Sequence, residues 1–194
     1  RSHRTISAAQ LTLAGADAAY AVQDGVAREL GWFGDDAPRY WKAGAASPTA
    51  TPTAAALPPL GVWPSPAQAR DWPFRLRGIE AEIAFRLGVN VYPEHAAGLD
   101  TAQAGALVEA MCVAIEIVDS RWTESLDAPA AAKLADLQSH GALVLGGWVE
   151  FEARDWVAQG CSVRIGAQPL FQCRGTHPLA DPLRVLPAWL RHAT

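Results

Sequence analysis

The stretch RGIEAEIAFRLG, residues 77–88, decides how the rest of the sequence is interpreted. Its apolar residues predict a β-strand, and a strand projects residues i and i+2 to the same face. Glu80 and Glu82 are therefore expected to point the same way. Two neighbouring carboxylates among apolar residues cost free energy unless something neutralises them. The spacing alone is compatible with a cation site, and also with an edge strand whose glutamates face solvent and pair with Arg77 or Arg86.

A third glutamate lies on a second predicted strand. In VAIEIVDSRW, residues 113–122, Glu116 stands between Ile115 and Ile117 in a segment dense in β-branched residues. A bound hard cation would neutralise three carboxylates on apolar strands, since magnesium, manganese and calcium take oxygen ligands. The sequence shows no grouping of histidines and cysteines that would favour a softer metal.

Length and composition limit the class of protein. The chain has 194 residues, 50% of them hydrophobic and 19% charged, which fits one domain with a sizeable core. The net charge of −4 and the lack of a basic cluster argue against nucleic-acid binding. No apolar run reaches the roughly 18–20 residues that a membrane span needs, and no secretory leader is visible. We therefore predict no nucleic-acid partner and no membrane partner.

The three cysteines, Cys112, Cys161 and Cys173, form an odd set without C-x-x-C spacing. This pattern disfavours a disulfide framework or a zinc site, and it favours a reducing cytoplasm. We interpret the cysteines as small hydrophobic residues, most firmly Cys112.

The remaining pattern predicts an α+β fold in which residues 1–194 form a single catalytic-type domain. Its N-terminal helix is expected at about 8–30, a Pro-rich loop at about 47–69, and a β-roll core at about 72–194 that is truncated at its C-terminal end. The loop is expected to be either a functional lid or a disordered segment. The other predicted elements are strands at 39–47, 78–88, 113–122 and 141–151, a hairpin at 161–175, and helical segments at 101–112, 128–138 and 181–192.

Five segments in collinear order resemble one known family. They are YWKAGAAS, GIEAEIAFRLG, AIEIVDSR, LADLQSHGALVLGG and GTHPLADPLRVLPAWL. Together they are similar to segments of the fumarylacetoacetate hydrolase superfamily, in the branch of the 2-keto-4-pentenoate hydratases and related 2-oxo-acid decarboxylases. The resemblance covers nearly the whole chain. It implies a mixed, largely antiparallel β-roll with flanking helices, and a homo-oligomer that is a dimer or larger.

The resemblance also implies a metal centre. Glu80, Glu82 and Glu116 match the ligands of the family's divalent metal, which would be Mg²⁺ or Mn²⁺, with Ca²⁺ as a further possibility. A 2-oxo acid substrate would chelate that ion through its carboxylate and keto oxygens, and the ion would stabilise the enolate that forms.

Three further residues match positions near the family's active site. Lys42 matches the lysine beside the bound 2-oxo acid, and Asp136 and Ser139 match the aspartate and serine of a D-N-A-S segment. Each has a simpler interpretation. Lys42 is compatible with a surface lysine whose stem packs on its aromatic neighbours. Asp136 is compatible with a cap or a local ion pair, and Ser139 with a turn.

The sequence departs from the family at two of these places. Leu137 stands where the D-N-A-S segment has asparagine, and the expected lid contains no acidic residue before Asp71. The paired histidines of the family's C–C hydrolases are not evident. We therefore expect a metal-dependent lyase that hydrates a 2-hydroxydienoate or decarboxylates a 2-oxo acid. The alternatives are a C–C bond hydrolase of an acylpyruvate-like substrate, and a degenerate member that binds metal or a 2-oxo acid without turnover.

Overall fold

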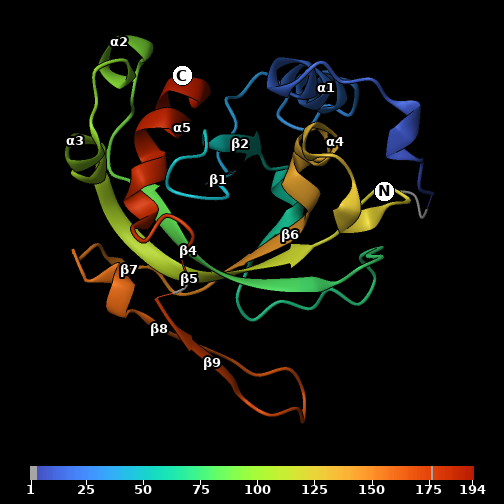
Figure 1. Ribbon diagram of the computed structural model, residues 1–194. Helices are drawn as coiled ribbons and strands as arrows, with labels where there is room; N and C mark the ends of the chain where they lie inside the picture. The colour runs from blue at the N-terminus through green and yellow to red at the C-terminus, as the bar shows by residue number, and fades with distance from the viewer. Residues whose placement is uncertain (1–3, 176) are drawn as a thin grey trace. The chain divides into compact units, whose positions relative to one another are not determined.

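Two long strands carry the three candidate glutamates (Figure 1). The computed structural model describes residues 4–175 and 177–194, and in it β4 spans Gly78–Leu87 and β5 spans Val108–Val118. Their sheet has the order β3-β6-β5-β4, with β7 paired to β5, so β4 is an edge strand. The chain divides into two compact units, and β4 and β5 contribute residues to both. The first unit comprises residues up to 42, 54–82 and 114–146, and the second comprises 43–53, 83–113 and 147–194.

The first unit contains a sheet built from β3 (Val62–Pro64), β6 (His140–Leu145) and the ends of β5 and β4. Strand β3 runs parallel to β6, and β6 runs antiparallel to β5. A second ladder joins β1 (Trp41–Gly44) to β2 (Thr53–Ala56), and the Leu57 amide extends it by donating to the Tyr40 carbonyl at 2.8 Å.

A β-bulge interrupts the pairing of β5 with β6. Ile117 lies opposite Ala142 but Val118 lies opposite His140, so Gly141 is the extra residue. A bulge changes the direction in which the neighbouring side chains point. A Cβ atom at Gly141 would lie only 2.3 Å from the Ile117 carbonyl oxygen, so only glycine fits there.

Gly141→Ala is therefore expected to destabilise the protein strongly. Overpacking of a filled site costs about 1–3 kcal/mol, and we expect the upper end because the obstacle is backbone. Gly147→Ala is the matched control, since a Cβ there meets nothing within 4 Å. Urea unfolding of both variants measures the difference. Equal unfolding midpoints for the two variants would contradict the close packing at the bulge.

Two helices of the first unit pack against each other. Helix α1 (Ala16–Glu29) lies against α4 (Ala130–Ala135). A hydrogen bond links the two helices: the buried Gln23 of α1 donates from Nε2 to the Leu134 carbonyl of α4 at 2.6 Å. A separate cluster contains Ala8, Trp122, Ala128 and Ala132.

The second unit has its own apolar core. Short helices α2 (Pro93–Ala96) and α3 (Thr101–Gly105) pack with the C-terminal helix α5 (Leu186–Ala193). The buried members of this core are Ala96, Leu99, Ala104, Val108, Leu186 and Leu190. Strand β7 (Val149–Glu150) pairs with β5, and β8 (Gly160–Val163) forms a hairpin with β9 (Phe171–Arg174). Among residues 4–175 and 177–194, the two units also contain short 3₁₀ segments at Ala8–Gln10, Pro59–Gly61, Ser125–Asp127, Leu137–Ser139, Trp156–Ala158 and Pro182–Val185.

The α+β class with mainly antiparallel strands is confirmed, as are the strand at 78–88 and the hairpin at 161–175. Several boundaries differ from the expectation, including that of the strand expected at 113–122, which spans Val108–Val118 as β5. The N-terminal helix begins at Ala16, and the segment 47–69 contains β2 and β3 rather than loop alone. The helix expected at 101–112 ends at Gly105, and the strand expected at 141–151 is two strands, β6 and β7.

Two of these differences have a clear local cause. Gly15 has a φ of 125°, which breaks the helical pattern before Ala16. The prolines that suggested a loop lie at the ends of β3 or outside it, where no ladder hydrogen bond is lost. That residues 1–194 act as one domain stays a prediction. In the described part of the chain, no helix is long and apolar enough to cross a membrane.

Candidate metal site

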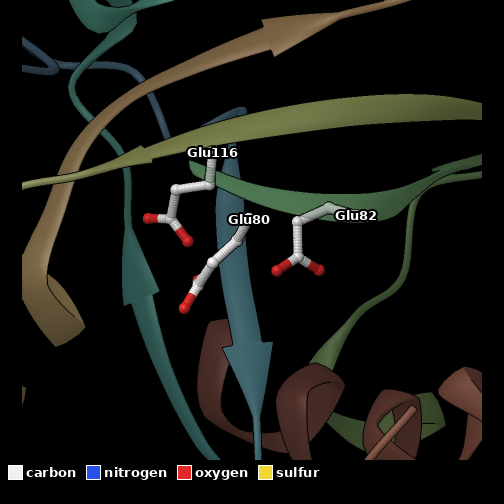
Figure 2. Close-up of side chains that lie close together, drawn as sticks. All are labelled: Glu80, Glu82 and Glu116. Carbon is white, nitrogen blue, oxygen red and sulfur yellow. The ribbon is translucent and has the colours of Figure 1, made fainter. Parts of the chain in front are cut away.

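Glu80, Glu82 and Glu116 come together on the sheet of the first unit (Figure 2). Each offers a carboxylate oxygen, and the three oxygens lie within 4.8 Å of one another. The three side chains point to the same side of their strands. Within residues 4–175 and 177–194, they form the one group of three or more potential metal ligands. The i, i+2 spacing on β4 thus does bring the first two carboxylates to one face.

The edge-strand interpretation is partly right. Strand β4 is an edge strand and Glu80 is exposed, whereas Glu82 is half-buried and Glu116 is only 3% exposed. Arg86, however, pairs with Glu109 at 2.6 Å. This ion pair of Arg86 therefore engages Glu109 and not the two glutamates of β4.

Glu116 is held by two cationic or donor groups of the first unit. The Lys42 Nζ lies 2.7 and 2.6 Å from its two carboxylate oxygens, and His140 Nδ1 lies 2.8 Å from Oε1. Burial opposes ionisation of Glu116. The hydrogen bond to His140 and the Lys42 charge outweigh that effect, so the pKa of Glu116 lies below its ordinary value. Glu116 is thus a buried carboxylate that stays ionised.

Glu80 and Glu82 have the opposite electrostatic situation. Burial, followed by repulsion from Glu116 and from Glu80, raises the pKa of Glu82 to about 7. Burial and the Glu116 charge also raise the pKa of Glu80, and Lys42 offsets only part of this. The neighbouring protein groups therefore do not compensate these two carboxylates.

This donor set fits a hard divalent cation. It consists of carboxylate oxygens alone, which Mg²⁺, Mn²⁺ and Ca²⁺ accept and which soft metals do not prefer. A cation between the three oxygens would remove the repulsion that raises the pKa values of Glu80 and Glu82.

The pH dependence of stability follows from Glu82. Its folded-state pKa of about 7 exceeds the ordinary value of 4.5, so the folded protein holds the proton longer than the unfolded chain does. The stability that protonated Glu82 contributes is fully present below its pKa in the unfolded chain, 4.5. It is lost as the pH rises through its pKa in the folded protein, about 7. With a chelator present, we expect wild type to lose stability relative to Glu82→Gln between pH 4.5 and 7. Chemical unfolding at several pH values measures this difference, and parallel curves for the two proteins would contradict it.

Lys42 is placed beside the site by β1 and by a left-handed turn. Its Nζ also donates to the Gln138 carbonyl at 3.1 Å. Leu137, Gln138 and Ser139 all have positive φ values, of 51°, 55° and 62°. Such values are uncommon outside glycine, and three in a row mark a turn that the surroundings must hold in place. Lys42 is therefore not a solvated surface lysine, since only 20% of its side chain is exposed.

Asp136 is engaged by Arg121 at the start of this turn. The Arg121 amide donates to Asp136 Oδ2 at 2.9 Å, and its Nε forms an ion pair with Oδ1. The same guanidinium donates to the carbonyl oxygens of His140 and Asp136 at 2.7 and 2.8 Å. These contacts match the local ion pair that we weighed for Asp136, and they clamp the turn next to Lys42.

Ser139 is buried within the same turn. Its amide donates to the Asp136 carbonyl at 3.0 Å, and its carbonyl accepts from the Asp119 amide at 2.8 Å. Both contacts are made by its backbone and are those of a turn residue. The catalytic roles of Asp136 and Ser139 stay predictions.

Two residues of the site had not been singled out for it. The His140 ring contacts Glu116, and Arg121 forms an ion pair with Asp136. The bulge at Gly141 changes the direction of the neighbouring side chains, and the His140 ring contacts Glu116. The His-Gly pair at the start of a strand is the one signal that the sequence offers.

The fold is similar to that of a solved enzyme. The 4-oxalocrotonate decarboxylase from Pseudomonas putida G7, complexed with magnesium and adipate, matches with a TM-score of 0.76 and 20% identity over 97% of this chain and 74% of that chain. The same enzyme complexed with calcium and acetate matches with a TM-score of 0.71 and 20% identity over 97% of this chain and 73% of that chain.

The chain therefore has the fold of these decarboxylases, which is the mixed, largely antiparallel fold that the fumarylacetoacetate hydrolase resemblance implied. At this identity the likeness shows the fold alone. No protein-family model matches the sequence, and no curated protein sequence matches it.

Proposed function

We propose that this chain is a divergent member of the fumarylacetoacetate hydrolase superfamily, and that it is a divalent-metal-dependent lyase acting on a 2-oxo acid. The observation that carries the proposal is the convergence of three carboxylate oxygens within 4.8 Å, on the fold of a decarboxylase solved with magnesium and with calcium. Decarboxylation is the reaction we favour over hydration, because both similar structures are decarboxylases.

Glu80, Glu82 and Glu116 are the proposed metal ligands, with Mg²⁺ or Mn²⁺ as the ion and Ca²⁺ as a substitute. A bound divalent cation would supply Lewis-acid stabilisation of the enolate that forms when a 2-oxo acid loses carbon dioxide from a second carboxylate, one placed so that the electrons of the broken C–C bond pass to the keto oxygen. The protein's own part is to hold the three ligands in place. His140 does this for Glu116, because its ring nitrogen fixes the orientation of a carboxylate that is 3% exposed.

Lys42 is the proposed residue that contacts the substrate. Its ammonium group already lies against Glu116 and the Gln138 carbonyl, so it is oriented by two acceptors. A positive charge held at this position attracts the substrate carboxylate and stabilises negative charge that develops on the keto oxygen. The clamp formed by Arg121 and Asp136 keeps the Gln138 carbonyl in place, so we assign Asp136 a positioning role beside its predicted catalytic one.

Binding without turnover is the second candidate function. Two observations favour it. The Asp136 carboxylate is paired with Arg121, and the neighbouring Leu137 is apolar and 5% exposed where the family has asparagine. Both features remove polar groups from the segment that the resemblance places near the reacting atoms.

The proposal is tested by release of carbon dioxide. The purified protein is incubated with a panel of 2-oxo acids, including 4-oxalocrotonate, in the presence of Mg²⁺ or Mn²⁺ and again with a chelator. We expect metal-dependent carbon dioxide release from at least one compound. Stabilisation by oxalate plus metal with no turnover of any 2-oxo acid would support the second candidate function instead. No effect of metal on either readout would contradict both.

A further inference from the structure

Two cysteines of the second unit face each other across the β8–β9 hairpin, which is labelled and coloured orange to red in Figure 1. Cys161 on β8 is the direct antiparallel partner of Cys173 on β9. Directly opposed residues project from the same face of a sheet, with Cα atoms about 4.5–5.5 Å apart. A disulfide requires a Cα separation of about 4.4–6.8 Å. The register therefore meets the geometric condition for a bridge without movement of the backbone.

The two side chains also interact. The side chain of Cys161 is hydrogen-bonded to that of Cys173. Neither thiol is part of a disulfide and both residues are half-buried, so a small reagent reaches them. Cys112, the remaining cysteine, is buried in β5.

The hairpin is held in register on both sides of the pair. Ser162 accepts a hydrogen bond from the Gln172 side chain at 3.2 Å, and the Gly175 amide donates to the Gln159 carbonyl at 3.0 Å. Gly175 has a φ of 61°, and a Cβ atom there would lie 2.2 Å from the Val157 carbonyl oxygen. The position of the two cysteines thus does not depend on a mobile loop.

We propose that Cys161 and Cys173 are a modification site at which a reversible disulfide forms when the protein meets a peroxide. A metal is the weaker alternative, because two sulfurs leave a tetrahedral site incomplete and no third ligand groups with them among the described residues. Cys161 and Cys173 belong to the second unit and the three carboxylates to the first, and this proposal does not depend on the proposed function.

The reaction balances with hydrogen peroxide as the oxidant. One thiolate attacks a peroxide oxygen, the S–O bond forms, the O–O bond breaks, and hydroxide leaves. The second thiolate then attacks the sulfenic sulfur, the S–S bond forms, and the S–O bond breaks to release hydroxide. The two released protons convert both hydroxides to water. Burial, followed by the neighbouring Cys173, raises the pKa of Cys161, so Cys161 stays a thiol more readily.

Thiol counting and peptide mapping test the proposal on the full chain. In denaturant, the reduced protein is expected to show three reactive thiols and the peroxide-treated protein only one. The oxidised protein is expected to be lighter than the reduced protein by about 2 Da, and dithiothreitol is expected to restore the original mass. Trypsin cleaves after Arg164, which lies between the two cysteines, so a bridge would hold two separate peptides together until they are reduced.

Two variants make the result specific. Cys112→Ser is expected to keep the linked peptides, because Cys112 is not part of the pair. Cys161→Ser is expected to abolish the link and to gain oxygen atoms at Cys173 instead. Oxygen addition without a linked peptide in Cys112→Ser would overturn the proposal, as would a bridge formed only between chains.

Discussion

Glu80→Gln is expected to weaken Mg²⁺ or Mn²⁺ binding by at least about 100-fold, and to lower metal-dependent turnover with it. Loss of a group that merely orients a metal ligand costs about 10–100-fold in affinity, so loss of a ligand is expected to reach or exceed that range. Glu80 suits the experiment because it is exposed and Lys42 and His140 pair with Glu116 instead. Removal of its charge therefore leaves the buried ion pair of the site in place.

Calorimetric titration with Mn²⁺ measures the affinity of this variant. Glu109→Gln is the matched control, since Glu109 is an exposed glutamate of β5 whose partner is Arg86. We expect wild-type affinity for the control. Equal affinities for wild type and Glu80→Gln would show that the carboxylates do not act as one site.

Lys42→Met is expected to lower the rate constant of the chemical step by about 100–1,000-fold, the range observed when a donor to a developing oxyanion is removed. The same change leaves the ionised Glu116 with His140 as its neighbour. Removal of one partner of a buried pair costs about 3–5 kcal/mol, and the 20% exposure of the Lys42 side chain reduces that figure through solvent screening. We therefore expect a protein that is less stable but folded.

Lys133→Met is the control for this variant, because Lys133 is the other lysine of the sequence and donates from an exposed position to the Leu126 carbonyl. Single-turnover kinetics with saturating metal separates the chemical step from binding. Turnover of Lys42→Met within a few-fold of wild type would remove Lys42 from the proposed chemistry. A control variant that loses as much activity would assign the effect to stability.

The sequence predicted the strand of Glu80 and Glu82 because alternation and apolar neighbours there agree with the observed β4. It also indicated a role for Glu116, since a carboxylate between two isoleucines has no simple place in a core. The charge pattern was informative because burial of charge is costly in any fold. The structure brings these three side chains together, and their role as ligands rests on that geometry.

Features that depend on tertiary packing were not visible. Strand β3 lies in a Pro-rich segment, and only its parallel pairing with β6 makes it a strand. The residues after Gly105 suggested a longer helix, but Val108 begins β5, because burial of that segment in the sheet overrides its local preference. The contact of His140 with Glu116 depends on the bulge at Gly141, for which the His-Gly pair is the one local signal.

The central claim is that Glu80, Glu82 and Glu116 hold one divalent cation, and anomalous scattering from crystals grown with Mn²⁺ and oxalate tests it most directly. The account predicts one strong peak within about 2.0–2.6 Å of a carboxylate oxygen from each of the three glutamates. It also predicts that this peak disappears in Glu80→Gln crystals. A Mn²⁺-saturated protein without density between these carboxylates, or with its metal bound by other residues, would contradict the account.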